Sequence, residues 1–181
     1  MSRQELLQKA ITGEYNAIRR YAEYARVAEK EKLPNVAYLF KAIVAGEKVH
    51  LENHKRALGE PFTPVDEPIE AKSTLENLKA ALAGETDEAA NMYPGFIKGL
   101  KRSKKEEDEI TRLSFEWALG TEKTHAMVLQ AAIDVVSQGK DYAGVTFFVC
   151  LACGSLHEGA ITEGVCPVCK HDVRLYKEVQ R

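Results

Sequence analysis

The chain has 181 residues, of which 45% are apolar and 29% charged, and its formal net charge at pH 7 is −2. This balance argues against binding to nucleic acid or to an anionic membrane surface. No apolar run approaches the roughly 18 residues that a membrane-spanning helix needs, and the first residues lack the apolar stretch of a signal peptide. We therefore expect a cytoplasmic protein with a sizeable core.

Residues 2–138 are rich in Ala, Leu, Glu and Lys and repeat their apolar positions about every 3.6 residues, which predicts α-helix. The four expected helices cover about 2–32, 34–58, 73–93 and 103–138. Capping boxes at Ser73 and Ser103 begin the last two, and the third can continue past Pro94 with a kink. The longest connection, 59–72, links two helix pairs, which is the wiring of a ferritin-like four-helix bundle.

The character of the sequence changes after Gly139, and residues 145–149 are β-branched and aromatic, which predicts a strand. We expect a bundle over 1–138, a linker over 139–144 and a small β domain over 145–181. A linker of this length spans at most about 20 Å. That reach is compatible with a small domain that serves the bundle of a partner subunit.

Each predicted helix carries one glutamate on its otherwise apolar face. These residues are Glu14, Glu47, Glu85 and Glu122. Histidines follow two of them by three residues, at His50 and His125, and Glu88 follows Glu85 in the same way. Residues three apart share a helix face, so each pair can point at one centre. A single such glutamate would most simply pair with Lys or Arg at the rim.

Taken together, these acidic side chains predict a site for multivalent cations, because several unpaired carboxylates in one core are very costly. Carboxylates with two imidazoles favour iron or manganese over zinc or copper. One Glu from each of two helices, with Glu-x-x-His from the other two, is the ligand set of ferritin-like di-iron and di-manganese proteins. His54, one turn beyond His50, we interpret as a neighbour of the site or a surface group, not a ligand.

The cysteines form two Cys-x-x-Cys pairs near the end of the chain. They are Cys150, Cys153, Cys166 and Cys169. Four thiolates at this spacing predict a tetrahedral metal cage, which either zinc or iron accepts. Lys170 follows the second pair, where a positive φ would suit glycine better, so we expect local strain or a different turn there.

The order and spacing of these motifs resemble the rubrerythrin family over nearly the whole chain. The matching pieces are Gly13-Glu14, Glu47-x-x-His50, Gly84-Glu85-x-x-Glu88 with Met92-Tyr93-Pro94, Glu122-x-x-His125 and the cysteine pairs. The resemblance implies a mainly α fold, with a ferritin-like di-iron bundle and a C-terminal rubredoxin-like FeS₄ domain. It also implies a hydrogen peroxide reductase that defends against oxidative stress.

The resemblance also implies a role for each site residue. Glu47 and Glu122 would bridge the two irons, Glu14 would bind the first, and Glu85 with His125 the second. Glu88 and His50 would alternate on the first iron, the carboxylate when it is oxidised and the imidazole when it is reduced. Tyr21 and Tyr93 match tyrosines that hydrogen-bond around the site.

The implied partners are hydrogen peroxide, an NADH-linked electron donor (a rubredoxin or a flavoprotein reductase) and a second copy in a head-to-tail homodimer. The sequence leaves two rival functions open. Iron oxidation and storage would need only the bundle ligands. A zinc-ribbon adaptor would carry zinc on its four cysteines beside a purely structural bundle.

Overall fold

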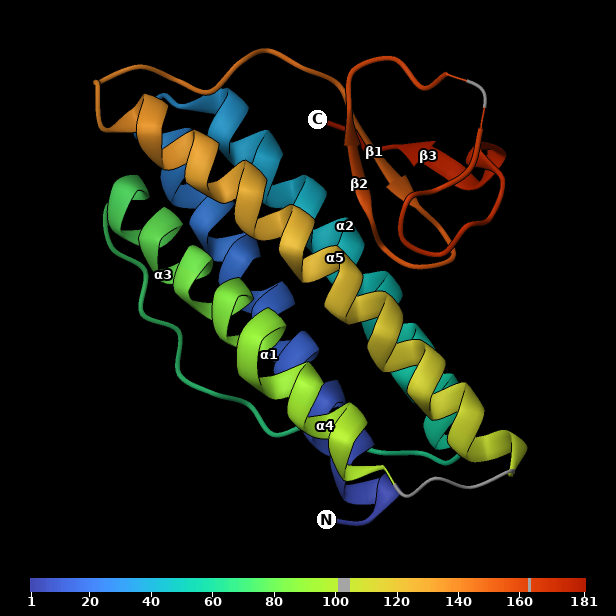
Figure 1. The fold of residues 1–181 in the computed structure, drawn as a ribbon. Coiled ribbons are helices and arrows are strands. Elements are labelled where there is room, and N and C mark those ends of the chain that lie inside the picture. Colours follow the sequence, from blue (N-terminus) through green and yellow to red (C-terminus); the bar gives the residue numbers. More distant parts are fainter. Residues whose placement is uncertain (101–104, 163) are drawn as a thin grey trace.

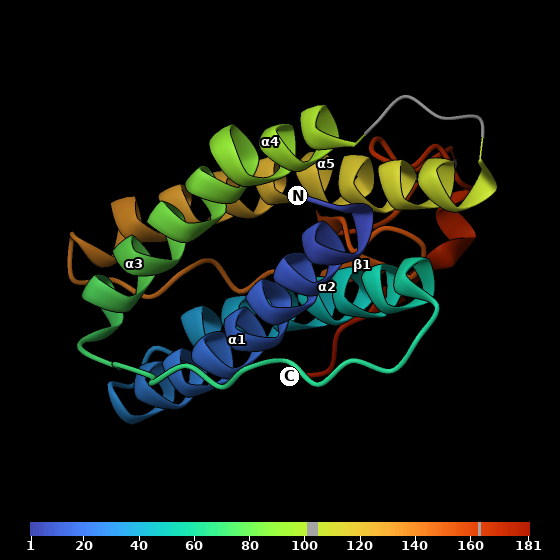
Figure 2. The same cartoon turned by 90° about the horizontal axis from the view of Figure 1, so that it is seen from below.

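The structure is a computed structural model and describes residues 1–100, 105–162 and 164–181. The bundle consists of α1 (Arg3–Lys30), α2 (Pro34–Leu58), α3 (Thr74–Asp87) with its continuation α4 (Tyr93–Gly99), and α5 (Glu106–Val136). The 59–72 connection runs along the bundle past α1 (Figures 1 and 2). The mainly α, ferritin-like bundle is therefore confirmed. Among the helices described, none is long and apolar enough to cross a membrane.

Local sequence signals begin and end the helices. Ser73 accepts from the Glu76 amide, and the Glu76 side chain accepts from the Ser73 amide, so the expected capping box is present. The cap expected at Ser103 lies outside the described residues. Between α3 and α4 the chain makes one π-helical segment, η1 (Glu88–Met92), and continues through Pro94. The third helix thus passes its proline by widening one turn, a change that often accompanies a functional site.

The apolar core of the bundle forms two clusters, one toward each end. Leu6, Leu7, Ala10 and Ile11 of α1 belong to one cluster, and Ala17, Tyr21 and Ala25 to the other. The same division runs through α2, α3–α4 and α5. In every helix the glutamate singled out from the sequence lies between the two clusters, so apolar packing at both ends fixes a polar layer in the middle.

The small domain contains a three-stranded antiparallel sheet in the order β2-β1-β3. Its strands are β1 (Phe147–Cys150), β2 (Leu156–Glu158) and β3 (Tyr176–Glu178), and a short 3₁₀ helix, η2 (Val173–Leu175), precedes β3. Phe148 pairs with His157 on one side and with Glu178 on the other. The predicted strand thus begins two residues later than expected, after a tight turn in which the Val145 amide donates to the Ala143 carbonyl.

The small domain packs against α2 and α5 of its own chain (Figure 1). The segment that leads to it is fixed at the start of α2, where Asp141 accepts from the Asn35 and Val36 amides at 2.9 and 3.1 Å. Asp141 thereby caps a helix that has no cap from its own N-terminal side chain. The Tyr38 hydroxyl donates to the Val179 carbonyl at 2.7 Å and accepts from the Phe147 amide at 3.2 Å.

Candidate metal centres

The buried layer contains two overlapping groups of metal-ligating atoms. One group is formed by Glu14, Glu47, His50 and Glu122, and the other by Glu47, Glu85, Glu122 and His125. Within each group the ligand atoms lie no more than 4.8 Å apart, and every side chain is buried. Because Glu47 and Glu122 belong to both groups, the arrangement suits two neighbouring cations that share two carboxylates.

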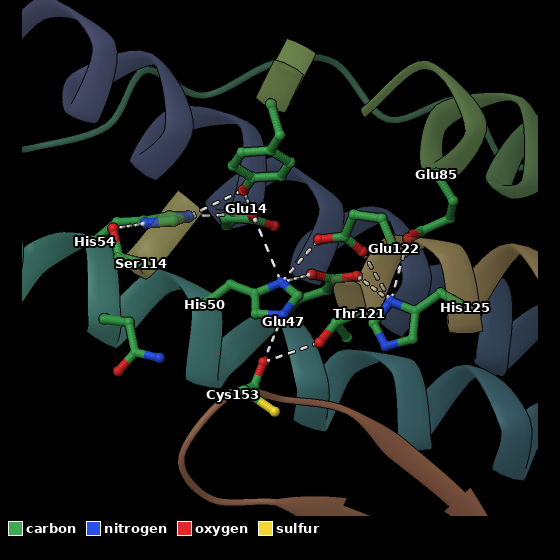
Figure 3. Close-up of polar contacts among 12 residues, drawn as sticks. Glu14, Glu47, His50, His54, Glu85, Ser114, Thr121, Glu122, His125 and Cys153 are labelled. Atoms are coloured by element: carbon green, nitrogen blue, oxygen red, sulfur yellow. Dashed lines mark hydrogen bonds and ion pairs between the residues drawn. The ribbon is translucent and has the colours of Figure 1, made fainter. Parts of the chain in front are cut away.

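Both histidines direct Nδ1 at the shared carboxylates (Figure 3). His50 Nδ1 lies 2.9 Å from Glu47 Oε2 and 3.0 Å from Glu122 Oε1. His125 Nδ1 lies 3.1 Å from oxygens of Glu47, Glu122 and Glu85. Each imidazole therefore points one nitrogen at several carboxylate oxygens. A histidine that binds the same ion as those carboxylates has this orientation.

Several carboxylate oxygens of this layer have no hydrogen bond within the described protein. They are Glu14 Oε2, Glu47 Oε1 and both oxygens of Glu122. Some lie about 3 Å from a histidine nitrogen, but one N–H can point at only one of them. Buried acceptors without donors are costly, and cations with open coordination positions would satisfy them. The donor set of oxygens and imidazoles fits iron on its chemistry.

Electrostatics show how the layer balances its charge without metal. Burial, and then the charge of Glu47, raises the pKa of both Glu14 and Glu85 well above its usual range. Burial alone would lower the pKa of His50, but Glu122 and Glu47 raise it to about 10. His125 shifts in the same direction because of Glu47 and Glu85. Protons thus occupy the layer in the metal-free protein, and cations would displace them.

The two shared carboxylates behave in the opposite way. Burial would raise the pKa of Glu47, yet the neighbouring His125 and His50 bring it below its usual range. The pKa of Glu122 is also lowered, because His50 and His125 outweigh burial and the charge of Glu47. The two carboxylates that lie between the groups are therefore the ones that stay ionised and ready to bridge.

Two tyrosines orient the carboxylates that are not shared. The Tyr21 hydroxyl donates to Glu85 Oε1 at 2.6 Å, and the Tyr93 hydroxyl donates to Glu14 Oε1. Both rings are buried, and burial is the main reason that the phenol pKa values lie well above their usual range. Each phenol therefore remains a hydrogen-bond donor to its carboxylate.

Glu88 is the one expected ligand that belongs to neither group. It is half-buried at the start of η1, whereas Glu85, one turn earlier, is fully buried. Burial and the charges of Glu122 and Glu85 raise the pKa of Glu88 well above its usual range. Glu88 therefore interacts electrostatically with the cluster. The side chain that lies directly against Glu47 and Glu122, however, is His50.

The four cysteines form a second centre in the small domain. Cys150 Sγ and Cys169 Sγ lie 3.7 Å apart, and Cys153 Sγ and Cys166 Sγ lie 3.6 Å apart, with no disulfide. Thiolates about 2.3 Å from a central ion would be about 3.8 Å from one another in a tetrahedron. The sulfurs are therefore already arranged around one tetrahedral position, which suits zinc or iron.

The two cysteine hairpins make similar turns with different residues. Gly154 follows the first pair with φ 85°, and Lys170 follows the second with φ 63°. Their amides donate to the Cys150 and Cys166 carbonyls at 2.8 and 3.0 Å. The expected strain at Lys170 is present, since a left-handed conformation costs a non-glycine residue about 1–2 kcal/mol.

The two centres touch through one backbone carbonyl, a contact that sequence reasoning missed. The Cys153 carbonyl oxygen lies 3.0 Å from His50 Nε2 and accepts from the Thr121 hydroxyl at 3.1 Å (Figure 3). In a second bond, Nδ2 of the Asn53 side chain donates to the Ala152 carbonyl at 2.8 Å. The only hint in the sequence is Gly46, a mid-helix glycine that lets the small domain approach closely.

His54 is a neighbour of the site, which is the first of its two sequence interpretations, and not a surface group. The side chain is fully buried, with Nε2 at 2.9 Å from the Tyr93 hydroxyl and Nδ1 at 3.2 Å from Ser114 Oγ. Burial and the nearby His50 lower its pKa to about 3, so the ring is neutral. It is a neighbour of the site that reaches Glu14 through Tyr93.

Comparison with known proteins agrees with this arrangement. The family model described as rubrerythrin matches residues 5–133. Rubrerythrin-2 from Clostridium acetobutylicum is 32% identical over 91% of this chain and 90% of the relative. Nigerythrin from Nitratidesulfovibrio vulgaris is 30% identical over 91% of this chain and 80% of the relative.

A solved structure of fully reduced, all-ferrous nigerythrin superposes with a TM-score of 0.85 at 28% identity. The match covers 98% of this chain and 87% of that chain, so it includes both the bundle and the small domain. Three findings lead to one assignment: the family model spans most of the bundle, one relative is more than 30% identical, and the fold is shared along the whole chain. The chain belongs to the rubrerythrin family.

Proposed function

We propose that this protein reduces hydrogen peroxide to water at two iron ions held in the bundle, with electrons delivered through an iron ion held by the four cysteines. The observation that carries this proposal is the contact of the Cys153 carbonyl with His50. It joins a thiolate centre suited to one-electron transfer to a carboxylate centre suited to two metals. Neither iron storage nor a zinc-ribbon adaptor would need that contact.

In this proposal Glu47 and Glu122 would hold both ions, because they alone belong to both ligand groups. Glu14 and His50 would hold one ion, and Glu85 and His125 would hold the other. Glu88 would take the place of His50 in the oxidised site, since added positive charge favours a carboxylate over a neutral imidazole. When bound, the two ions supply the two electrons that break the O–O bond of peroxide.

The residues of the chain supply position and protection. Burial of the residues in both ligand groups keeps bulk water away from the reaction and strengthens each charge interaction in the layer. The Tyr21 and Tyr93 hydroxyls donate to Glu85 and Glu14, and so hold one oxygen of each carboxylate in place. The overall reaction takes one hydrogen peroxide, two electrons and two protons to two waters.

The proposed route for electrons between the two centres consists of a few covalent bonds and one hydrogen bond. Cys153 is both a thiolate of the small domain and the owner of the carbonyl that contacts His50 Nε2. Its Nε2–H donates to that carbonyl while Nδ1 faces the bundle carboxylates, which fixes the tautomer of the ring. An NADH-linked rubredoxin or flavoprotein reductase would return electrons to the partly exposed Cys169 side.

The same contact is compatible with the homodimer expected from the sequence. In this structure the small domain lies on the bundle of its own chain. Exchange of small domains between two copies, head to tail, would form identical bonds with the partner's domain. Either arrangement gives each bundle one cysteine centre.

A single experiment separates the proposal from its rivals. Iron-loaded protein is reduced without oxygen and mixed with hydrogen peroxide, and the ferric-thiolate absorption of the cysteine centre is followed by stopped flow. The proposal predicts rapid return of that absorption in the wild type and a much slower return in His50→Ala. Oxidation of the bundle iron without the cysteine centre would favour iron storage. Zinc on the cysteines would favour the adaptor.

A further inference from the structure

A buried chain of hydrogen bonds leads away from the bundle site. It begins at Glu14, which the Tyr93 hydroxyl contacts, and continues from that hydroxyl to His54 Nε2 at 2.9 Å. His54 Nδ1 then lies 3.2 Å from Ser114 Oγ. The four groups come from four different helical elements, α1, α4, α2 and α5. Packing of the whole bundle is therefore needed to bring them into line.

Every group between the ends of this chain can donate one hydrogen bond and accept another. A phenol and a serine hydroxyl do so, and a neutral imidazole has one N–H and one bare nitrogen. The Ser114 hydroxyl has a second partner in the Thr111 carbonyl at 2.9 Å, so its proton can point either to that carbonyl or toward His54. The chain is thus continuous in both directions. Ser114 is its one member with measurable exposure, at 5%.

Peroxide reduction needs such a connection. The reaction consumes two protons per peroxide, and the residues of both ligand groups are buried. Ionised carboxylates accept hydrogen bonds but bring no protons of their own. On the other side of the site, Tyr21 donates to Glu85, but among the described residues no histidine stands behind it. A histidine thus follows the tyrosine on the Glu14 side and not on the Glu85 side. This difference indicates that the residues behind Glu14 do more than orient its carboxylate.

We propose that Ser114, His54 and Tyr93 form a proton path to Glu14, and that His54 is the positioning residue that makes the path continuous. This inference rests on the proposed peroxide reduction. A proton taken up at Ser114 displaces the serine proton to His54 Nδ1. The ring passes its Nε2 proton to Tyr93, the phenol passes its own proton to Glu14 Oε1, and Glu14 hands it to the substrate oxygen. Each group keeps its starting charge, but the His54 ring now carries its proton on Nδ1. Return of that proton to Nε2 by tautomerisation resets the chain, and two passages supply the protons for one peroxide.

Three substitutions test the path. His54→Phe keeps an aromatic ring against Tyr93 and Phe115, which lie 5.8 and 5.3 Å from His54 by ring centroids, but it removes both nitrogens. Ser114→Ala removes the outer end, and Ser114→Thr keeps the hydroxyl as the matched control. In single turnover of the reduced, iron-loaded protein with peroxide, the first two should react at least about tenfold more slowly, within the range of a lost proton-transfer group. Ser114→Thr should restore the rate.

The hydrogen bonds are also measured without metal or activity. In ¹⁵N spectra of the metal-free protein, the His54 ring should show one protonated and one bare nitrogen. Ser114→Ala should shift the Nδ1 signal, and Ser114→Thr should leave it near the wild-type position. A doubly protonated ring, or spectra unaffected by Ser114→Ala, would refute the path.

Two kinetic outcomes would also overturn the inference. One is an unchanged rate and an unchanged solvent isotope effect in His54→Phe. The other is a rate that falls only in proportion to lost bundle iron, because His54 would then merely hold the site together. Failure of wild-type protein to consume peroxide would instead count against the proposed function, and the ring spectra would still decide whether the hydrogen-bonded chain exists.

Discussion

Gly46 gives the most specific test of the contact between the two domains. A Cβ at this position would lie 2.8 Å from the Gly154 carbonyl oxygen and 2.9 Å from His125 Nε2. Ordinary contacts begin at 3.4 Å, so Gly46→Ala must move two backbones apart by about 0.6 Å. Overpacking of this kind costs about 1–3 kcal/mol. That cost corresponds to about a 5- to 150-fold shift from docked to undocked small domain.

The substitution should therefore slow electron transfer more than it harms the bundle. Alanine in a helix interior is favoured over glycine by about 1 kcal/mol, which offsets part of the clash. Peroxide-driven return of the ferric-thiolate absorption should slow by at least about fivefold. Iron in the bundle, measured on the same sample, shows whether the neighbouring His125 has been disturbed.

Gly13→Ala is the matched control, because Gly13 precedes Glu14 in α1 as Gly46 precedes Glu47 in α2. Apart from its chain neighbours and the backbone of its own helix, no atom of the described residues lies within 4 Å of a Cβ at Gly13. This variant should gain the helix propensity and keep the wild-type rate. If Gly46→Ala with full bundle iron reoxidises its cysteine centre as quickly as Gly13→Ala, the close approach of the two domains has no part in electron transfer.

Three further predictions follow from the site. Glu122→Gln removes a shared ligand and should empty both bundle positions, while the metal on the cysteines stays. The control Glu116→Gln, at an exposed position of the same helix, should keep all metals. Elemental analysis measures both, and metal retained in the bundle of Glu122→Gln would contradict the bridging role. The pKa of His50 is raised from 6.5 to about 10 in the metal-free fold. Protonated His50 therefore stabilises the folded state fully below pH 6.5, and this contribution is lost as pH rises through 10. The raised pKa values of Glu14 and Glu85 also make the folded state less stable as pH rises. Urea unfolding should therefore show the metal-free protein weakening over that range, and a rise in stability would be inconsistent with this. Lys170→Gly relieves the strain of a φ of 63° and should stabilise the small domain by about 0.5–1 kcal/mol after the entropy of glycine is subtracted. An unfolding temperature no higher than that of the wild type would contradict this prediction.

The bundle was predictable because local signals and the hydrophobic period agree. Capping at Ser73 fixed one helix start, and the 3.6-residue stripe placed Glu14 and Glu122 on inward faces. The family and fold class expected from these motifs are confirmed by the comparisons. The positions of the glutamates between two apolar clusters follow from the same stripe, since each helix crosses the layer once.

The contacts between distant segments were not predictable in this way. The Cys153 carbonyl meets His50 because the small domain is fixed on the bundle by bonds of Asp141, Tyr38 and Asn53, and no local pattern encodes that docking. His54 has the spacing of a site residue, but it is buried against Tyr93, Phe115 and Ser114, which come from other helices. The sequence predicts a kink past Pro94, but not that the helix passes it with the π-helical turn η1.

We propose that buried carboxylates from four helices hold two iron ions beside a third on the cysteines. Mössbauer spectroscopy of ⁵⁷Fe-loaded protein measures this directly. We predict two components in a two-to-one ratio, a coupled pair of oxygen- and nitrogen-bound irons and one iron with four thiolates. A spectrum with thiolate-bound iron alone, in a bundle that stays empty at saturating iron, would contradict the account.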